Sequence, residues 1–146
     1  MDVAVNWGNN VVNIDFAFIC DYADVSGKVN ALGIGFDTIY TPKVPCKHPS
    51  FFLVAQVRAN VVEAGEKSLE VHLIDEDGKE IIPSIKGKFA IPHPAAGTES
   101  IGRIALHFFN IEFPQYGLYS LHAVIEGHEM VRIPLKVAQH SAPSPS

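Results

Sequence analysis

Cysteine is scarce in this sequence and occurs only at Cys20 and Cys46 among 146 residues. Scaffolds that depend on disulfides are shorter and much richer in cysteine. A chain of about 150 residues buries roughly 70% of the surface that it exposes when unfolded, so it needs neither cross-links nor a metal to fold. We therefore expect two reduced thiols and no cofactor.

Clusters of basic residues and long apolar runs are also missing. Lys and Arg number 11 against 16 Asp and Glu, which gives a formal net charge of -5. This balance argues against partners such as nucleic acid or an anionic membrane surface. No stretch approaches the ~18 apolar residues of a membrane-spanning helix, and the first residues lack the basic start of a signal peptide. The cytoplasm is therefore the expected location.

Helical periodicity is almost absent, and apolar and polar residues alternate instead. Turn residues separate the alternating segments at short intervals, which favours an all-β fold: a two-sheet antiparallel β-sandwich, immunoglobulin-like or C2-like, with eight or nine strands. We expect one domain over residues 1–138 and a flexible tail at 139–146. The predicted strands fall within residues 13–20, 27–40, 50–60, 67–75, 85–91, 103–113, 118–126 and 130–138.

Turn sequences predict how neighbouring strands pair. Asp77-Gly78 is typical of a two-residue hairpin turn whose two central residues both take positive φ. The predicted strands at 118–126 and 130–138 can place their apolar side chains on one face only if the loop between them has an odd number of residues. Residues 127–129 are predicted to form this loop. Pro134 has no backbone donor, so the last strand is expected to be a sheet edge at that point. Residues 93–102 could form one helix, but their proline and two glycines favour a long connection that crosses between sheets.

Tyr119 opens a predicted strand directly after a turn that contains proline and glycine. Immunoglobulin-like sandwiches often place a tyrosine at such a corner, where its hydroxyl binds the backbone of the preceding connection. In that interpretation residues 103–111 and 118–126 belong to different sheets. The alternative is a simple hairpin of the two segments, which would set His107 opposite His122.

The stretch FICDYADVSGKVNALG gathers a thiol, two carboxylates, a phenol and a lysine. Cys20 alternates in step with Phe16 and Phe18, which predicts a thiol that faces the core. A thiol buried among apolar groups is a poor nucleophile. The residues that follow it form turns readily. We therefore interpret the stretch as two strands and their connection rather than as a catalytic cluster.

Seven histidines offer the main alternative chemistry, yet no pair has the spacing of a zinc finger or a metalloprotease. His72, His107 and His122 lie on the predicted outer faces of their strands. They would form a metal site only if the fold brought them together, and otherwise they are separate surface residues. The acidic DEDG turn lacks the downstream glutamate of a calcium loop, and phosphate-loop and nucleophile-elbow motifs are absent. No catalytic, cofactor-binding or metal-binding residue is assigned.

Gln56 and Arg58 interrupt the apolar run at 50–60 on one face of the predicted strand. A polar pair on a central strand faces solvent, lines a groove or forms a contact between subunits. The sequence leaves these three interpretations open.

Three segments resemble a bacterial family of small proteins of unknown function: FAFICDYADVSGKVNALGIGFDTIY, HPSFFLVAQVR and EVHLIDEDGKEI. The shared features are an apolar strand that ends at Cys20-Asp21, a glycine-containing strand, a His-Pro connection and an acidic turn. The resemblance extends from Ile14 to Pro92. It implies a β-sandwich and carries over no catalytic residue.

Three functions remain open at this point. The expected one is a non-enzymatic structural or protein-interaction module, a homo-oligomer or the binder of a protein partner, that uses an exposed strand edge or the face with Gln56 and Arg58. The second is a small-ligand binder that uses the loops at 20–28 and 93–100. The third is a metal-dependent enzyme built on strand histidines.

Overall fold

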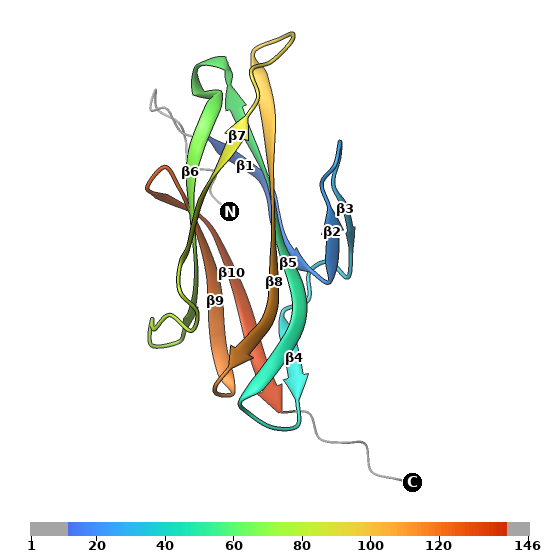
Figure 1. The fold of residues 1–146 in the computed structure, drawn as a ribbon, viewed down its shortest axis with the longest axis vertical. Coiled ribbons are helices and arrows are strands. Elements are labelled where there is room, and N and C mark those ends of the chain that lie inside the picture. The colour runs from blue at the N-terminus through green and yellow to red at the C-terminus, as the bar shows by residue number, and fades with distance from the viewer. Residues whose placement is uncertain (1–11, 140–146) are drawn as a thin grey trace.

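The computed structural model describes residues 12–139 and shows an all-β protein (Figure 1). Ten strands and one short 3₁₀ helix occur in this range, against the eight or nine strands predicted. No helix in this part of the chain is long and apolar enough to cross a membrane. Apart from Gln139, the predicted tail lies outside the described residues. The elements are β1 (Asn13–Cys20), β2 (Tyr22–Asp24), β3 (Asn30–Leu32), β4 (Thr38–Thr41), β5 (Cys46–Asn60), η1 (Val61–Glu63), β6 (Gly65–Asp75), β7 (Ile85–Ile91), β8 (Glu99–Phe113), β9 (Gly117–Ile125) and β10 (His128–Gln139).

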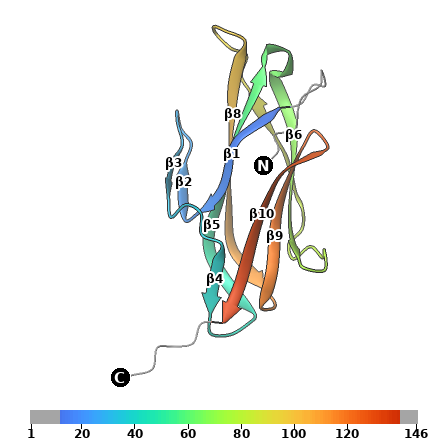
Figure 2. The same ribbon diagram turned by 180° about the vertical axis from the view of Figure 1, so that it is seen from behind.

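The strands form three sheets of unequal size. A three-stranded sheet has the order β1-β5-β8, a five-stranded sheet has the order β4-β10-β9-β6-β7, and β2 and β3 form a separate hairpin. The two larger sheets face each other, and the β2–β3 hairpin lies outside the three-stranded sheet (Figures 1 and 2). Pairing is antiparallel except between β4 and β10, which run parallel. The prediction of an all-antiparallel fold was wrong here, because the chain leaves the hairpin, changes sheets and meets β10 in the same direction.

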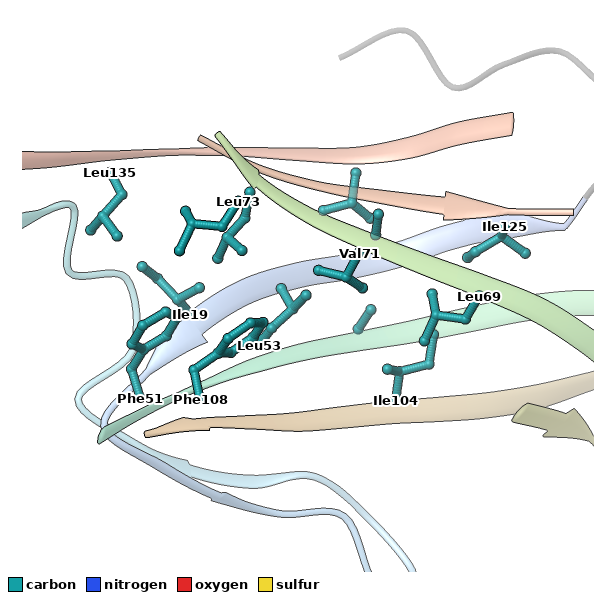
Figure 3. Close-up of a cluster of buried hydrophobic side chains, with 14 of the residues drawn as sticks. Ile19, Phe51, Leu53, Leu69, Val71, Leu73, Ile104, Phe108, Ile125 and Leu135 are labelled. Carbon is teal, nitrogen blue, oxygen red and sulfur yellow. The ribbon is translucent and has the colours of Figure 1, made fainter. Parts of the chain in front are cut away.

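One buried cluster fills the space between the two larger sheets, with side chains from both of them (Figure 3). Strand β5, predicted as central, lies between β1 and β8 and contributes alternate residues to this core. Phe51 is fully buried there and stacks on Phe108, with ring centroids 4.8 Å apart. Leu69, Val71 and Leu73 of β6 face them from the five-stranded sheet, as their spacing of two residues dictates.

The corner at Tyr119 has the predicted structure. The Tyr119 hydroxyl donates to the Gln115 carbonyl at 2.7 Å and accepts from the Gln115 N–H at 3.2 Å. Strand β8 lies in the three-stranded sheet and β9 in the five-stranded sheet, so the chain changes sheets here. The alternative hairpin is wrong, because His107 pairs with Phe52 and His122 with Arg132. The connection from β7 to β8 also crosses between these sheets, as predicted, but it is shorter than the predicted 93–102 because β8 already begins at Glu99.

The two predicted turns differ in detail from the structure. In the acidic turn only Gly78 takes positive φ, at 82°, and the Asp75 carboxylate accepts hydrogen bonds from the N–H groups of Asp77 and Lys79. This side-chain cap replaces the predicted double left-handed turn. Between β9 and β10 the predicted odd loop is instead a two-residue turn at Glu126 and Gly127, with φ of 49° and 80°.

A β-bulge in β10 restores the core-facing register that the predicted odd loop was meant to provide. The register shifts between Glu129 and Val131, after which Val131 pairs with Ala123. The bulge inserts one extra residue, so apolar side chains of both strands again share a face. Pro134 pairs only with β9, as predicted for an edge, whereas β4 joins the strand from Lys136 onward.

Candidate functional site

Cys20 is buried as predicted, but it does not face the main core. It packs with Ala23 and Val54 in a second apolar cluster under the β2–β3 hairpin, while Ile19 faces the main core. The predicted face was wrong because the hairpin provides a cover on the outer side of β1. Burial raises the pKa of the Cys20 thiol, and its Sγ lies 3.4 Å from the Tyr22 carbonyl to which it donates. A protonated, covered thiol is not a nucleophile.

The fold separates the three strand histidines. His72 and His122 are direct neighbours on β6 and β9, on the outer face of the five-stranded sheet. His107 belongs to β8 in the other large sheet. Among residues 12–139 no group of three or more His, Cys, Asp or Glu side chains is placed to hold a metal ion. The metal site that would have needed all three histidines is therefore not assembled.

His122 instead joins a chain of hydrogen bonds across two strands. Its Nε2 lies 2.7 Å from the Ser120 hydroxyl, and its Nδ1 lies 2.5 Å from the Glu129 carboxylate. The hydrogen bond with His122 lowers the pKa of Glu129. Arg132 also binds Glu129, at 3.3 Å. Sequence reasoning missed this chain because it placed Glu129 in the loop at 127–129, whereas Glu129 belongs to β10 and pairs with Val124.

This arrangement has the order of groups found in acyl-transfer enzymes, hydroxyl to imidazole to carboxylate. Such enzymes also need free N–H donors that stabilise an oxyanion. Strand β9 lies between β10 and β6, so its backbone N–H groups are engaged by the two neighbouring strands. These hydrogen bonds fix the His122 ring between Ser120 and Glu129, and they connect β9 to β10.

Aromatic rings gather on the outer side of the three-stranded sheet. Phe52 stacks flat on His107, with centroids 4.3 Å apart, and meets Tyr22 edge to face at 5.5 Å. His107 continues to Phe109 at 5.4 Å, and its Nε2 lies 2.6 Å from the Ser50 hydroxyl. We call this surface the aromatic face and define it by six residues: Phe16, Phe18, Tyr22, Phe52, His107 and Phe109.

A polar network borders the aromatic face on the same side of the sheet. Arg58 binds Asp15 through Nη2 at 2.8 Å, and Gln56 donates to the same carboxylate at 2.9 Å. Gln56 in turn accepts from Arg103 at 3.1 Å. The hydrogen bond from Arg58 lowers the pKa of Asp15. Gln56 and Arg58 thus face outward and are both bound to Asp15, whose position beside them no pattern in the sequence indicates.

Replacing Asp15 with asparagine is expected to flatten the acid side of the stability profile. The folded carboxyl has the lower pKa, so the unfolded state binds more protons in acid. Its stabilising contribution is complete above the ordinary pKa of 3.8 and is lost as the pH falls through the lowered folded value. For a partly exposed pair the contribution is at most about 1 kcal/mol.

Urea denaturation at a series of pH values checks this expectation. Asp77→Asn, in the exposed acidic turn, is the matched control and should keep the shape of the original profile. If the Asp15→Asn profile runs parallel to that of the unmodified protein, Asp15 does not supply the acid-sensitive contribution.

The two loops predicted to form a pocket, at 20–28 and 93–100, are each held near the start of β8. The tip of the β2–β3 hairpin is held where β8 begins, because Arg103 donates to the Gly27 carbonyl at 3.0 Å. The connection before β8 is anchored by the Val61 N–H, which donates to the Thr98 carbonyl at 2.8 Å. Both segments extend toward the same end of the three-stranded sheet (Figure 1).

Known structures similar to this chain are distant. No curated protein matches the sequence. A β-glucosidase from Listeria innocua in complex with isofagomine is 11% identical over 73% of this chain, with a TM-score of 0.48. The alkylpurine DNA glycosylase AlkC from Pseudomonas fluorescens, bound to DNA containing an abasic site analog, is 11% identical over 69% of this chain, with a TM-score of 0.38. The chain spans 15% of the first protein and 27% of the second, so neither likeness bears on its function.

A protein-family comparison gives a closer relationship. Residues 15–138 match the family described as Family of unknown function (DUF6941). This match agrees with the resemblance to an uncharacterised family that the segments around Cys20, His48 and Asp75 indicate. Because it spans most of the chain, the protein belongs to the family of unknown function DUF6941.

Proposed function

We propose that this protein is a non-enzymatic interaction module that associates with a second copy of itself through the aromatic face. In this proposal the two larger sheets form an immunoglobulin-like sandwich that acts as a rigid support. The shared core and the tyrosine corner between β8 and β9 support that layout. The two free cysteines suit a reducing compartment such as the cytoplasm.

The observation that carries the proposal is the exposure of large rings that belong to one series of ring contacts. Phe109 is 63% exposed and Tyr22 is 54% exposed, and Phe52 and His107 connect them. Single exposed apolar residues are ordinary, but a contiguous group of rings is typical of an interaction surface. Rings in mutual contact are already ordered, so their association costs little side-chain entropy.

A second copy fits this surface because four of its six rings belong to phenylalanine, which carries no charge. At its border Arg58 is paired with Asp15, and Arg103 is hydrogen-bonded to Gln56 and to the Gly27 carbonyl. A two-fold axis would bring the same patch of both copies together. The border then supplies the polar rim that surrounds the apolar centre of protein interfaces.

The non-enzymatic part of the proposal rests on the chemistry of the described residues. Cys20 is covered and protonated. The hydroxyl–imidazole–carboxylate chain at His122 sits on a strand paired on both sides. Neither arrangement presents an activated nucleophile next to free oxyanion donors.

Replacing Phe109 with serine is expected to weaken self-association by at least about tenfold, equivalent to about 1.4 kcal/mol. The substitution removes the most exposed ring of the aromatic face without touching the core. Sedimentation equilibrium over a range of protein concentrations measures the dissociation constant directly. Leu118→Ser is the matched control, because Leu118 is 56% exposed but lies on β9 of the other large sheet.

Two outcomes would contradict the proposal. One is an unmodified protein that stays monomeric at millimolar concentration. The other is an equal loss of association in the Leu118→Ser protein, which would show that the contact does not depend on the aromatic face.

A further inference from the structure

An apolar groove opens between the two larger sheets, on the side where β1 and β10 face each other (Figure 2). Its cavity volume is about 290 Å³. Because the lining is mostly apolar, its exposure to water costs free energy that an apolar occupant would recover. We call this opening the β1–β10 groove; its lining residues are Ile14, Phe16, Ala17, Met130, Val131, Arg132 and Ile133.

The two strands that flank the groove have free edges there. β1 is the outermost strand of the three-stranded sheet, and β4 covers β10 only from Lys136 onward. Within residues 12–139, no strand pairs with the edge of β1 or with the part of β10 before Lys136 that face each other here. Free edges expose backbone N–H and C=O groups, and native proteins usually cover them. The groove therefore offers both apolar contacts and backbone partners to an extended segment.

The charged side chains at the rim of the groove are already paired. Asp15 binds Arg58 at 2.8 Å, and Glu129 binds Arg132 at 3.3 Å. Arg132 also pairs in register with His122, on the outer face of the five-stranded sheet. An ion in the groove would lose its hydration without gaining a free counter-charge. The groove thus suits an uncharged apolar occupant.

Val12 brings the preceding part of the chain to this side of the molecule. It is 4% exposed and belongs to the main core. Ile14, two residues later, lines the groove and pairs with Val57, which is fully buried. Val12 and Ile14 therefore share the core-facing side of β1. Residues 1–11 are attached next to the groove, and so short a tether gives them a high effective concentration there.

The sequence before Val12 has the pattern of a strand followed by a turn. Val3, Val5 and Trp7 alternate with small or polar residues, and residues 8–11 read GNNV. Alternation with a period of two is typical of a strand with one buried face, and glycine and asparagine favour turns. Residues 3–11 contain no charged side chain. This segment therefore has the apolar, uncharged character that the groove requires.

Parity agrees with a hairpin between this segment and the start of β1. A four-residue loop at 8–11 would set Trp7 opposite Val12 and Val5 opposite Ile14, and loops of that length are common in hairpins. Directly opposite side chains share a face of the sheet. Because Val12 and Ile14 face the core, Trp7 and Val5 would face it too.

We infer that residues 3–7 form an added strand in the β1–β10 groove, with Val5 and Trp7 directed between the sheets. The segment would cover the free edge of β1 and close this side of the molecule. The inference does not rest on self-association. Phe16 belongs both to the groove and to the aromatic face, so the experiment has to distinguish this segment from a second copy.

Intrinsic fluorescence of the full chain tests the inference, because Trp7 is the only tryptophan in the sequence. The native protein should emit at a shorter wavelength than the urea-unfolded protein, and acrylamide should quench it severalfold less. Both differences should persist on dilution and in the Phe109→Ser protein, in which self-association is expected to be weak. Protection of Trp7 that disappears in either case would assign the groove to a second copy and overturn the inference.

Paired variants test the location of Trp7. Val5→Glu and Met130→Glu should each shift its emission and quenching to those of the unfolded chain, since each places a charge in the apolar groove. Ala4→Glu is the matched control for the segment, because alternation directs Ala4 to the opposite face. Leu118→Glu is the control for the sheet, because Leu118 is 56% exposed on β9, outside the groove.

Both control proteins should keep the native emission. Far-UV circular dichroism will establish that each variant folds. A native Trp7 as exposed as in urea would overturn the inference. So would equal effects of Val5→Glu and Ala4→Glu, or of Met130→Glu and Leu118→Glu.

Discussion

Replacing Phe51 with alanine is expected to lower the free energy of unfolding by about 3–5 kcal/mol. Phe51 is fully buried on β5, where it stacks on Phe108 with an angle of 9° between the ring planes. It also meets Phe36 edge to face, with ring centroids 6.3 Å apart. Truncation removes these contacts and leaves a cavity that rigid strands on both sides cannot close.

Equilibrium denaturation in urea measures this loss, with an unchanged slope as evidence that the native state keeps its compactness. Leu118→Ala is the control, because the Leu118 side chain is 56% exposed outside the aromatic face and its truncation should change stability by less than about 0.5 kcal/mol. The expectation would be wrong if the free energy of unfolding fell by less than about 1 kcal/mol, which is roughly the contribution of one hydrogen bond. So small a loss would show that the core repacks around the gap.

Tyr119→Phe is expected to cost about 1–3 kcal/mol, although it removes a single oxygen atom. The Tyr119 side chain is buried, and its hydroxyl is the partner of both backbone groups of Gln115. Without the hydroxyl, an N–H and a carbonyl at the corner between the sheets lose their partner together. Burial also raises the pKa of Tyr119, so the hydroxyl remains a donor throughout the neutral pH range.

The neighbouring Tyr116→Phe provides the comparison for that result. Its hydroxyl lies 3.4 Å from the Thr41 carbonyl, which is a long and weak hydrogen bond. Thermal unfolding should therefore show a much smaller decrease in midpoint temperature for Tyr116→Phe than for Tyr119→Phe. Equal decreases in the two proteins would mean that the corner is not held by the Tyr119 hydroxyl.

Much of the fold could be predicted because local patterns agree with the final structure. Alternation at 67–75 and 118–126 marks strands whose one face is buried, and the side-chain period of two leaves little freedom in their orientation. The proline-glycine turn before Tyr119 also predicts the change of sheet. The all-β class follows from these signals, whereas β2 and β3, with three residues each, are too short to produce a period.

The errors have a common cause in contacts between distant segments. The outward orientation of Cys20 is stable only because the β2–β3 hairpin covers it, and no local pattern near β1 reveals a cover. The parallel pairing of β4 depends on β10, which lies far away in sequence. Sequence reasoning orients side chains within one strand, but it does not show what packs over them.

The candidate site was harder to predict for the same reason. Phe52 and His107 stack because β5 and β8 pair with the register that places them opposite each other. Gln56 and Arg58 were visible as polar residues in an apolar run, but their partner Asp15 lies on β1. The bulges in β1 and β10 could not be located either, because the alternation of apolar residues shows only that one residue is extra and not which one.

The position of β4 in the five-stranded sheet has a consequence for the order of events during synthesis. β4 is made early, yet within residues 12–139 its one neighbour in the sheet is β10. A ribosome-bound chain that has not yet released residues 136–139 leaves β4 without a template. Pairing between such distant segments is slow to form and exposes unpaired backbone meanwhile. Emergence of β10 from the exit tunnel is therefore the event that allows β4 to take its place in the sheet, whereas β1 can pair with β5 earlier.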